Sequence, residues 1–412
     1  MIPLPLEEIA RMAPGELETI DDAHEVTAVQ VDSRRIERGA LFVALGRGAE
    51  FKEDAFASGA AATLVPDDAF AALGAIGRAV RDRSRARVIG ITGSTGKTST
   101  KDILAALCGP SARTIAAEAS YNNEIGVPLT LCRLEGDTEV CVLELSMRGF
   151  GQIAELCEIA RPEIGAITNI GPAHLELVGD LAGVVRAKSE LIAALPPGGT
   201  AVVPQDFPVE RDDIDVVRVA TPAASVESGR AIVDGVSFNF TARHHIANAA
   251  TALATLDALG LARPDAVEVD FSRWRGDEAP LPEDGLLIND AWNANPVSMR
   301  AALDYLAERA GERRRVAILG DMAELGRTAP QYHLEIGEAV AATGVDELLA
   351  VGTLARGYVE GAAGVESHSV ANVHEALREL DEVVRPGDAV LVKGSRAMGL
   401  EAVADALAAV TT

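Results

Sequence analysis

The stretch that decides the fold of this chain is RVIGITGSTGKTSTKDIL, residues 87–104. Residues 88–92 are apolar and β-branched, which predicts a short buried strand. Residues 99–107 have the apolar spacing of a helix. The glycine-rich turn GSTGKT, residues 93–98, joins the two. Because a strand, a glycine loop, Lys-Thr and a helix form the arrangement that holds nucleotide phosphates, the stretch predicts a phosphate-binding loop.

The residue types in this loop suit that chemistry. Glycines let backbone N–H groups approach an anion without interference from Cβ, and the helix N-terminus adds unpaired donors and partial positive charge. Lys97 can reach the terminal phosphates, and the Thr98 hydroxyl can ligate Mg²⁺. The loop is a tighter form than usual, since Ile91 stands where a first glycine is common. The alternative interpretation is a strand–helix turn with solvated side chains.

Size and charge restrict the class of protein. A chain of 412 residues has room for two or three domains. The formal charge of −25 argues against a nucleic-acid partner, so an anionic substrate must be held by local cations and helix termini. No run is long enough to cross a bilayer, the N-terminus lacks a secretion signal, and the four cysteines show no CxxC spacing. We therefore expect a cytoplasmic protein with no membrane insertion.

Two further apolar runs end in residues that can bind a cation. Residues 140–143 predict a strand with Glu144 at its carboxyl end, and residues 164–168 predict another, followed by a loop containing His174. Carboxyl ends of parallel strands lie on one edge of a sheet, so both residues should meet the phosphate loop. We expect them to ligate Mg²⁺. Because magnesium prefers oxygen, a structural or proton-accepting role for His174 remains the alternative.

Other polar residues have two interpretations each. Ser33 and Arg34 stand at a strand end, where an arginine can fork onto phosphate or simply lie in an exposed turn. Asn122 and Asn123 precede a helix and either contact substrate or serve as turn residues. Asn248, near the start of an Ala-rich helix, either caps it or reads an adenine edge.

Two basic residues further along the chain are also ambiguous. Arg275 lies just before the second expected boundary and can reach phosphate across a cleft. Lys188 falls in an expected helix, and its pattern alone suggests a solvated surface lysine.

Composition shifts predict two domain boundaries. The basic run 78–87 marks the first, and the Pro- and Gly-rich run 262–285 contains the second, near residue 277. From residue 286 onward, strands and helices alternate, and the strand ends carry Asp290, Asp321 and the KGSR run 393–396. The predicted fold class is α/β with three domains: a small α/β module at 1–82, a central P-loop ATPase-like mostly parallel sheet at 83–276, and a Rossmann-like doubly wound domain at 277–412.

These motifs together resemble those of the Mur ligases of bacterial cell-wall synthesis, most of all the members that add D-alanyl-D-alanine. The segments that carry the resemblance are DSRRIERGALFVAL, GITGSTGKTST, YNNEIGVPLTL, LELSMRGFGQI, TNIGPAHLE, HHIANAATALA, INDAWNANPVSMRAAL, AILGDMAELG and LVKGSR. Departures are small: Trp292 replaces a usual tyrosine and Ala291 a common serine. Neither removes an expected ligand.

The resemblance implies an enzyme that uses ATP and Mg²⁺. It would form an amide bond between UDP-N-acetylmuramoyl-tripeptide and D-alanyl-D-alanine through an acyl phosphate, and it would be a monomer. The three domains would bind the UDP substrate, ATP and the incoming amine, in that order along the chain. The alternatives are a related Mur or folylpolyglutamate-type ligase with a different amine, or a nucleotide-dependent regulatory protein.

The resemblance also implies roles for individual residues. Lys188 aligns with a lysine that family members carry as a carbamate, which replaces the surface interpretation, because carbamate oxygens ligate Mg²⁺ whereas an ammonium repels it. The residues implied to hold ATP are Gly93, Ser94, Thr95, Gly96, Lys97, Thr98, Ser99, Asn248 for the base, Arg275 for phosphate and Asp321 for ribose. Those implied for metal are Thr98, Glu144, His174 and Lys188; for catalysis, Lys97, Lys188 and His174; for substrates, Ser33, Arg34, Asn122, Asn123, Asn293 and Asn295.

Overall fold

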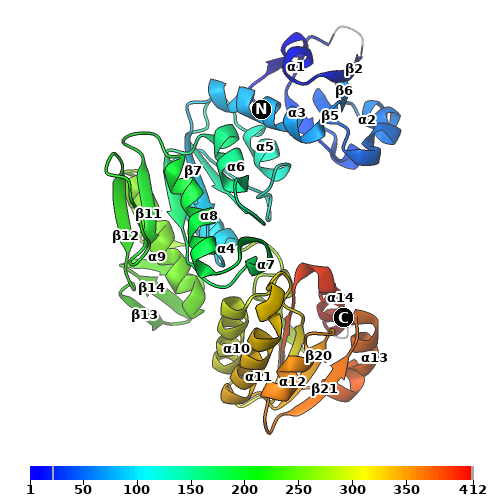
Figure 1. Cartoon of the computed structure of the whole chain (residues 1–412), viewed down its shortest axis with the longest axis vertical. Helices are drawn as coiled ribbons and strands as arrows, with labels where there is room; N and C mark the ends of the chain where they lie inside the picture. The colour runs from blue at the N-terminus through cyan, green and yellow to red at the C-terminus, as the bar shows by residue number, and fades with distance from the viewer. Residues whose placement is uncertain (21–22, 410–412) are drawn as a thin grey trace.

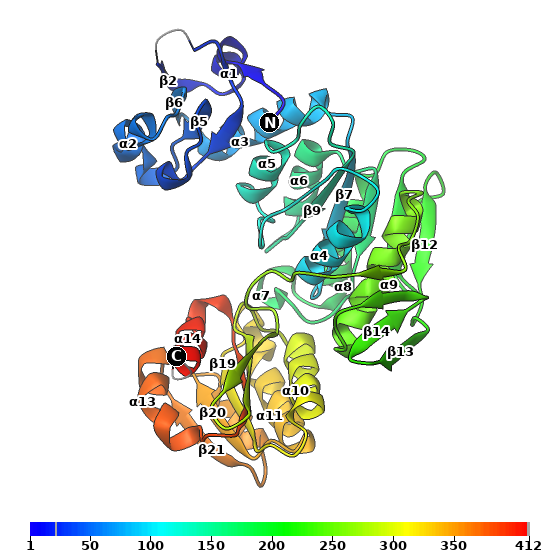
Figure 2. The ribbon, with the colours of Figure 1, turned by 180° about the vertical axis from the view of Figure 1, so that it is seen from behind.

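The computed structural model describes residues 1–20 and 23–409. Three α/β domains follow one another along the molecule, with the N-terminal domain at one end, the C-terminal domain at the other and the central domain between them (Figure 1, Figure 2). Each is built around a sheet of its own. The predicted three-domain α/β fold is confirmed.

The central sheet is entirely parallel. Its six strands lie in the order β12 (Asp215–Val219), β11 (Thr200–Pro204), β10 (Ile164–Ile167), β7 (Arg87–Thr92), β9 (Val140–Glu144) and β8 (Thr114–Ala116). The predicted strands at 88–92, 140–143 and 164–168 are therefore neighbours. Gly90 pairs with Gly165 on one side and Leu143 on the other, so the three carboxyl ends meet at one edge.

Alternate side chains of these strands pack into two cores. Ile89 and Ile91 belong to the core beneath helices α4 and α9, whereas Val88 and Leu143 belong to the core beneath α5, α6 and α8. This two-sided burial explains the continuous apolar runs in the sequence. The central helices are α4 (Lys97–Cys108), α5 (Gly126–Leu131), α6 (Gln152–Ala160), α7 (Leu175–Val178), α8 (Leu181–Ala193) and α9 (Arg243–Ala258).

A small additional sheet lies between residues 224 and 267. Its order is β13 (Ala224–Glu227), β14 (Arg230–Val233), β15 (Val236–Phe238) and β16 (Ala266–Val267). It packs against the α4/α9 side of the central domain, because Val233 and Phe238 share the core of those helices.

The N-terminal domain has a four-stranded sheet in the order β2 (Gly15–Thr19), β6 (Ala62–Pro66), β5 (Ala40–Val43) and β4 (Ala28–Gln30), with β1 (Leu4–Pro5) paired to β3 (Glu25–Val26). Its helices are α1 (Leu6–Met12), α2 (Lys52–Ala57), α3 (Ala69–Arg83) and the 3₁₀ turns η1 (Ser33–Arg35) and η2 (Gly46–Phe51).

Helix α3 extends into the basic run where the sequence predicts the first boundary. It is amphipathic, with Ile76 and Val80 buried and Arg83 in its last turn. It packs against α5 closely enough that a Cβ on Gly77 would lie 2.8 Å from Cα of Pro128. The helix therefore fastens the N-terminal domain to the central one.

The C-terminal sheet lies in the order β17 (Asp277–Leu281), β18 (Gly285–Asp290), β22 (Ala389–Lys393), β19 (Arg315–Gly320), β20 (Glu347–Val351) and β21 (Glu366–Val370). Only the edge strand β17 runs antiparallel to its neighbour. The helices are α10 (Pro296–Ala310), α11 (Ala329–Ala342), α12 (Arg356–Gly361), α13 (Val373–Val383) and α14 (Glu401–Ala409), with η3 (Gly326–Thr328) and η4 (Arg396–Met398). The sequence did not predict β17, α12 or β21.

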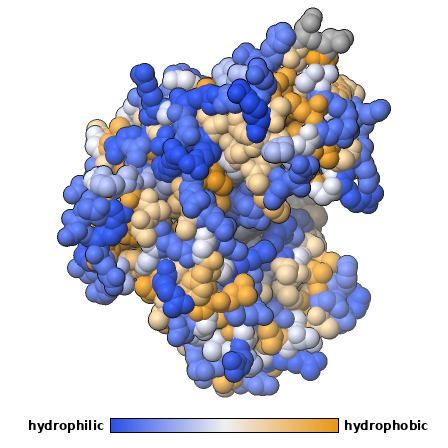
Figure 3. Space-filling model, turned by 45° about the horizontal axis from the view of Figure 1, so that its top comes forward, coloured by the Kyte–Doolittle hydropathy of each residue, from blue (hydrophilic) through white to orange (hydrophobic). Residues whose placement is uncertain are grey.

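The face drawn in Figure 3 is largely hydrophilic, with apolar residues scattered over it, and it is hollowed between its upper and lower parts. Within the described ranges, no helix combines the length and apolar character needed to span a bilayer. The cysteines are buried and unbridged, as expected for reduced thiols, and burial raises the pKa of each to about 12: Cys108, Cys132, Cys141 and Cys157.

Candidate active site

A cavity of about 750 Å³ lies between the central and C-terminal domains. The phosphate loop and the ends of β9 and β10 contribute one wall, and the loops after β18, β19 and β22 contribute the other. Thirteen of the residues predicted for the site line this cavity: Ser94, Thr95, Gly96, Lys97, Thr98, Ser99, Asn122, Glu144, His174, Asn248, Arg275, Asn293 and Asn295.

The phosphate loop requires its glycines. Gly93 has φ +153°, and a Cβ there would lie 1.9 Å from the Thr168 hydroxyl oxygen. Gly96 has φ +77°, and a Cβ there would lie 2.3 Å from Oδ1 of Asn248. Lys97 begins α4, and its ammonium donates to the carbonyl of Gly93 at 2.8 Å. The side chain of Lys97 thus folds back across the phosphate loop.

The segment after β10 fastens the loop. Asn169 accepts a hydrogen bond from the Thr95 N–H at 3.0 Å and donates to the Thr95 hydroxyl at 2.6 Å. Ser94 donates from its hydroxyl to the carbonyl of Gly171 at 2.9 Å. These residues therefore shape the phosphate loop from the neighbouring strand.

Glu144 is almost fully buried at the end of β9, with 1% of its surface exposed. One carboxylate oxygen accepts from the Thr98 hydroxyl and the other from the Asn122 amide, each at 2.7 Å. The positive charges of Lys97 and Arg275 lie near it. A buried carboxylate beside a hydroxyl is a donor set of the hard oxygen type that Mg²⁺ prefers, so the residues fit that ion.

Arg275 reaches this group from the segment that leads into the C-terminal domain. Its Nη2 donates to the Thr98 hydroxyl at 3.0 Å and to the Ser120 hydroxyl at 2.8 Å. Burial lowers the pKa of Arg275 from its usual value. The guanidinium also lies 5.4 Å from the ring of Trp292, which stacks on Trp274 at a centroid distance of 5.7 Å. The positive charge of Arg275 therefore lies against Thr98, one of the predicted metal ligands.

Lys188 lies inside the central domain, contrary to the surface position that its pattern alone suggests. Only 1% of its surface is exposed. Burial, and then the neighbouring charge of Lys97, lower the pKa of Lys188 well below its usual value. Helical spacing gives the reason, because Val184, Lys188 and Leu191 occupy one buried face of α8. Lys188 does not line the cavity itself, but the charge of Lys97 acts on it.

His174 lines the cavity but is held by the C-terminal domain. Its Nδ1 lies 2.5 Å from Oε2 of Glu324, in the loop after β19. The histidine has φ +55° and precedes α7. Its hydrogen-bond partner is therefore a residue 150 positions away, and not Glu144.

Three of the predicted asparagines make structural contacts, and one of them contacts the phosphate loop. Asn295 caps α10 by accepting from the Ser298 N–H at 3.0 Å, and its amide donates to the carbonyl of Ser94 at 3.3 Å. The carbonyl of Asn293 accepts from Lys393 at 2.8 Å. Asn123, outside the cavity, turns the chain into α5 by accepting from the Gly126 N–H at 3.0 Å.

Three predicted residues lie elsewhere. Asp321 accepts a hydrogen bond from the Ala355 N–H at 2.7 Å and does not line the cavity. Ser33 and Arg34 belong to η1 in the N-terminal domain. The guanidinium of Arg34 folds onto Asp32 at 2.8–2.9 Å, which lowers the pKa of that carboxyl to about 2. The structure does not bring these residues together with the phosphate loop.

Several cavity residues were not among the predicted site residues. The sequence placed Asp290 and Lys393 at strand ends but gave them no role; they form a 2.6 Å ion pair in the cavity wall. Ser120 and Glu324 were missed altogether, because neither has a spacing that marks it. Arg35 was also missed: it donates to Glu118 at 3.0 Å and joins the N-terminal to the central domain.

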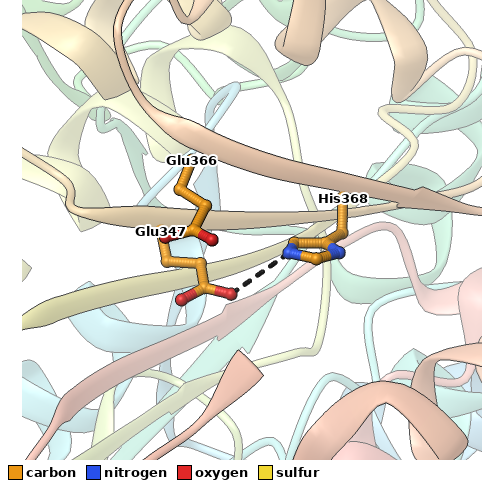
Figure 4. A group of neighbouring side chains, drawn as sticks. All are labelled: Glu347, Glu366 and His368. Carbon is orange, nitrogen blue, oxygen red and sulfur yellow. Dashed lines mark ion pairs between the residues drawn. The ribbon is translucent and has the colours of Figure 1, made fainter. Parts of the chain in front are cut away.

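A second group of possible ligands lies on β20 and β21, away from the cavity. The side chains of Glu347, Glu366 and His368 have ligand atoms within 4.8 Å of one another, and His368 lies 3.4 Å from Glu347 (Figure 4). Glu347 is also ion-paired with Arg314, which bonds Asp388 as well. Because an arginine already supplies the compensating positive charge, we interpret this group as an ion-pair network.

Comparisons with known proteins agree with this geometry. Residues 91–256 match a family model described as the Mur ligase middle domain, and residues 279–396 match one described as the Mur ligase, glutamate ligase domain. The UDP-N-acetylmuramoyl-tripeptide--D-alanyl-D-alanine ligase of Synechocystis is 33% identical over 93% of this chain and 92% of its own length, and that of Escherichia coli is 34% identical over 99% of both. A crystal structure of MurF from Acinetobacter baumannii superposes with a TM-score of 0.83 at 28% identity, covering 98% of this chain and 99% of that one.

Proposed function

This chain belongs to the Mur ligase family, and we propose that it joins D-alanyl-D-alanine to UDP-N-acetylmuramoyl-tripeptide with cleavage of ATP, in peptidoglycan synthesis. The observation that carries this proposal is one cavity in which the phosphate loop and the buried Glu144 face the strand-end loops of a second domain. Such a cavity can hold a nucleotide against one wall and an incoming amine against the other.

The reaction needs an activated carboxylate, because oxide is too poor a leaving group to be displaced by an amine. The peptide carboxylate attacks the γ-phosphorus of ATP, forming an acyl phosphate and releasing ADP. The dipeptide amine then attacks the carbonyl carbon, phosphate leaves, and the amine gives up a proton. Lys97 and the loop N–H groups stabilise charge on the transferring phosphoryl group. Closing the cavity between two domains keeps water away from the acyl phosphate.

We propose that Thr98 and Glu144 hold Mg²⁺, with His174 as a further ligand. The ion would neutralise charge on the phosphates and on the attacking carboxylate. Support comes from the 2.7 Å contact between the Thr98 hydroxyl and the Glu144 carboxylate, both buried. Arg275 contacts the same hydroxyl, so it has to turn toward phosphate when the ion binds.

Lys188 is proposed to carry a carbamate. Carbamates form when a neutral amine attacks carbon dioxide and loses a proton. Burial beside Lys97 favours the neutral amine of Lys188, because a second buried ammonium would be repelled. The resulting anion would face Lys97 and could contribute oxygen ligands to the metal site.

The remaining roles follow from the positions of the residues. Asn248, which touches the phosphate loop at Gly96, is proposed to contact the base of ATP. Asp321 is proposed for the ribose, and Asp290, the strand-end carboxylate that lines the cavity, is a second candidate. Asn122, Asn123, Asn293 and Asn295 are proposed for the peptide and dipeptide, and Ser33 and Arg34 for the UDP end of the substrate. The proposed units are 1–82 for the UDP substrate, 83–276 for ATP and 277–412 for the amine.

Phosphate release with UDP-N-acetylmuramoyl-tripeptide and ATP, measured with and without D-alanyl-D-alanine, tests the proposal. We expect release only with both substrates, and a product heavier by the dipeptide less water. Release with a different amine in place of D-alanyl-D-alanine would indicate another ligase of the family. Binding of ATP without release for any carboxylate–amine pair would indicate a regulatory protein instead.

A further inference from the structure

We propose that Glu324 of the C-terminal domain is a positioning residue for the metal site: it orients His174, so that this part of the site is complete only when the two domains are docked. The inference rests on the proposed metal role of His174. It adds a residue from a different domain, whose contribution depends on how that domain is placed.

The contact itself fixes the chemistry of the histidine ring. The Glu324 carboxylate can only accept hydrogen bonds, so the hydrogen of the 2.5 Å contact belongs to Nδ1 of His174. In the neutral ring, the lone pair is then on Nε2. Within residues 1–20 and 23–409, Nε2 has no hydrogen-bond partner. A histidine whose Nδ1–H is held by a carboxylate and whose Nε2 is unengaged is the usual arrangement of a histidine ligand.

The backbone on both sides is shaped for this contact. His174 has φ +55° and Glu324 has φ +62°, a left-handed conformation that non-glycine residues adopt only where the surroundings hold them. The Glu176 N–H donates to the carbonyl of Glu324 at 3.1 Å. Gly326 approaches so closely that a Cβ there would lie 3.2 Å from Cα of Glu176. The two strained turns therefore support each other across the interface.

Glu324 moves with the C-terminal domain and not with the metal site. The Met322 N–H donates to Nε2 of His333 at 3.0 Å, and the Ala323 N–H donates to the Ser395 hydroxyl at 2.8 Å. Both acceptors belong to the C-terminal domain. Separating the domains would therefore remove the carboxylate from His174 and free the ring to turn.

The Glu324 carboxylate has a second charged neighbour. Its second oxygen lies 3.9 Å from Nε of Arg148, an arginine with 77% of its side chain exposed. Arg148 thus contacts the same carboxylate without touching the histidine, which makes it a matched control.

The test measures metal binding directly. Mn²⁺ is titrated into the protein with a non-hydrolysable ATP analogue and followed by electron paramagnetic resonance, using the wild type, Glu324→Gln, Arg148→Ala and His174→Ala. We expect Glu324→Gln to weaken Mn²⁺ binding by about tenfold, as for other residues that hold a metal ligand, and Arg148→Ala to leave it unchanged. In protein labelled with ¹⁵N-histidine, pulsed electron paramagnetic resonance should detect ¹⁵N coupling to Mn²⁺ in the wild type. The coupling should be weaker in Glu324→Gln and absent in His174→Ala.

The outcomes separate this inference from the proposed function. Wild-type Mn²⁺ affinity and nitrogen coupling in Glu324→Gln, with both reduced in His174→Ala, would overturn the role of Glu324 and leave the metal role of His174 intact. Mn²⁺ affinity and nitrogen coupling in His174→Ala equal to those of the wild type would overturn both the role of Glu324 and the metal role of His174. Glu324 is 39% exposed, so the glutamine variant is expected to fold, and an unchanged unfolding temperature would verify this.

Discussion

Asn122 donates a hydrogen bond from Nδ2 to Oε1 of Glu144 at 2.7 Å, and this contact joins the predicted metal ligand to a loop that the N-terminal domain and the segment before the C-terminal domain both contact. The loop comprises residues 117–123. Arg35 of the N-terminal domain bonds its Glu118, and Arg275 of the interdomain segment bonds its Ser120. The position of Glu144 therefore depends on a loop held from two sides.

The first prediction concerns Asn122 itself. Asn122→Ala removes one of the two side-chain donors to a buried carboxylate, and a hydrogen bond to a charged group contributes about 1.5–3 kcal/mol. We expect kcat/KM to fall about 10- to 100-fold, measured by ATP-dependent phosphate release. Asn372→Ala is the control: it removes only the N-cap of α13 in the C-terminal domain, so it should cost about 1 kcal/mol of stability with little loss of activity. Equal activity losses in both variants would count against a special role for Asn122.

The position of Glu144 was predictable because it depends on strand order and burial. An acid directly after a continuous apolar strand lies at the carboxyl edge of a parallel sheet. Lys188 also carried a signal, since Val184, Ala187 and Leu191 place it on the apolar face of α8. The surface interpretation of Lys188 is wrong, because it rests on the charge of the side chain and not on the spacing of the apolar residues around it.

Other residues could not be found from local pattern. His174 and Glu324 are 150 positions apart, and their contact depends on how two domains dock. Asp321 lies one residue beyond the end of β19, where its carboxylate accepts a hydrogen bond from the Ala355 N–H. Asp290 is the last residue of β18 and faces the cavity. A shift of one position at a strand end changes the direction of the side chain.

A second prediction separates two adjacent arginines. Arg35 bridges two domains, whereas Arg34 bonds only Asp32 in its own turn. If the Arg35 bridge couples the two binding sites, an ATP analogue should increase the affinity for the UDP substrate, and Arg35→Ala should reduce that increase. Arg35 and Glu118 are both about half exposed, so the pair contributes at most about 1 kcal/mol, or about fivefold in affinity.

Calorimetric titration of the UDP substrate, with and without the ATP analogue, measures that difference. Arg34→Ala should leave the ratio of the two affinities unchanged, even if both affinities fall through lost substrate contact. A ratio that is the same in Arg35→Ala and in the wild type would show that the bridge is only structural.

The third prediction concerns Lys97. Lys97→Ala removes the ammonium that stabilises the transferring phosphoryl group, so ligation should fall by at least about 1,000-fold. Binding of the UDP substrate, measured by calorimetry, should be nearly unchanged, because the proposed contacts to that substrate lie in other segments. Lys52→Ala is the control, since Lys52 lies in the N-terminal domain and pairs with Glu18. Comparable turnover in Lys97→Ala would contradict the proposed role.

The fourth prediction concerns alkaline stability. Burial raises the pKa of the four thiols from 9.0 to about 12, so in the unfolded chain they lose protons at lower pH than in the folded protein. Their stabilising contribution is complete below pH 9 and is lost as the pH rises toward 12. The free energy of unfolding, measured with urea, should fall between pH 9 and 10. At pH 8 a thiol reagent should label the native protein only as fast as the protein unfolds locally. In denaturant the same reagent should label all four thiols.

The last prediction concerns Arg275, whose Nη2 spans the hydroxyls of Thr98 and Ser120. Arg275→Lys keeps the charge but loses the planar fork, so we expect the KM for ATP to rise about tenfold. Arg273→Ala is the matched control, because Arg273 lies over the ring of Trp274 and, among the described residues, bonds neither Thr98 nor Ser120.

Movement of Arg275 can be observed independently of turnover. The chain has two tryptophans, and they are Trp274 and Trp292, stacked beside this arginine. If Arg275 leaves Thr98 for a phosphate, the ring environment changes, so an ATP analogue should alter tryptophan emission in the wild type. The change should be reduced in Arg275→Lys and retained in Arg273→Ala. If the ATP analogue changes tryptophan emission in Arg275→Lys as much as in the wild type, Arg275 stays in place when nucleotide binds. Thr98 could not then ligate the metal as proposed.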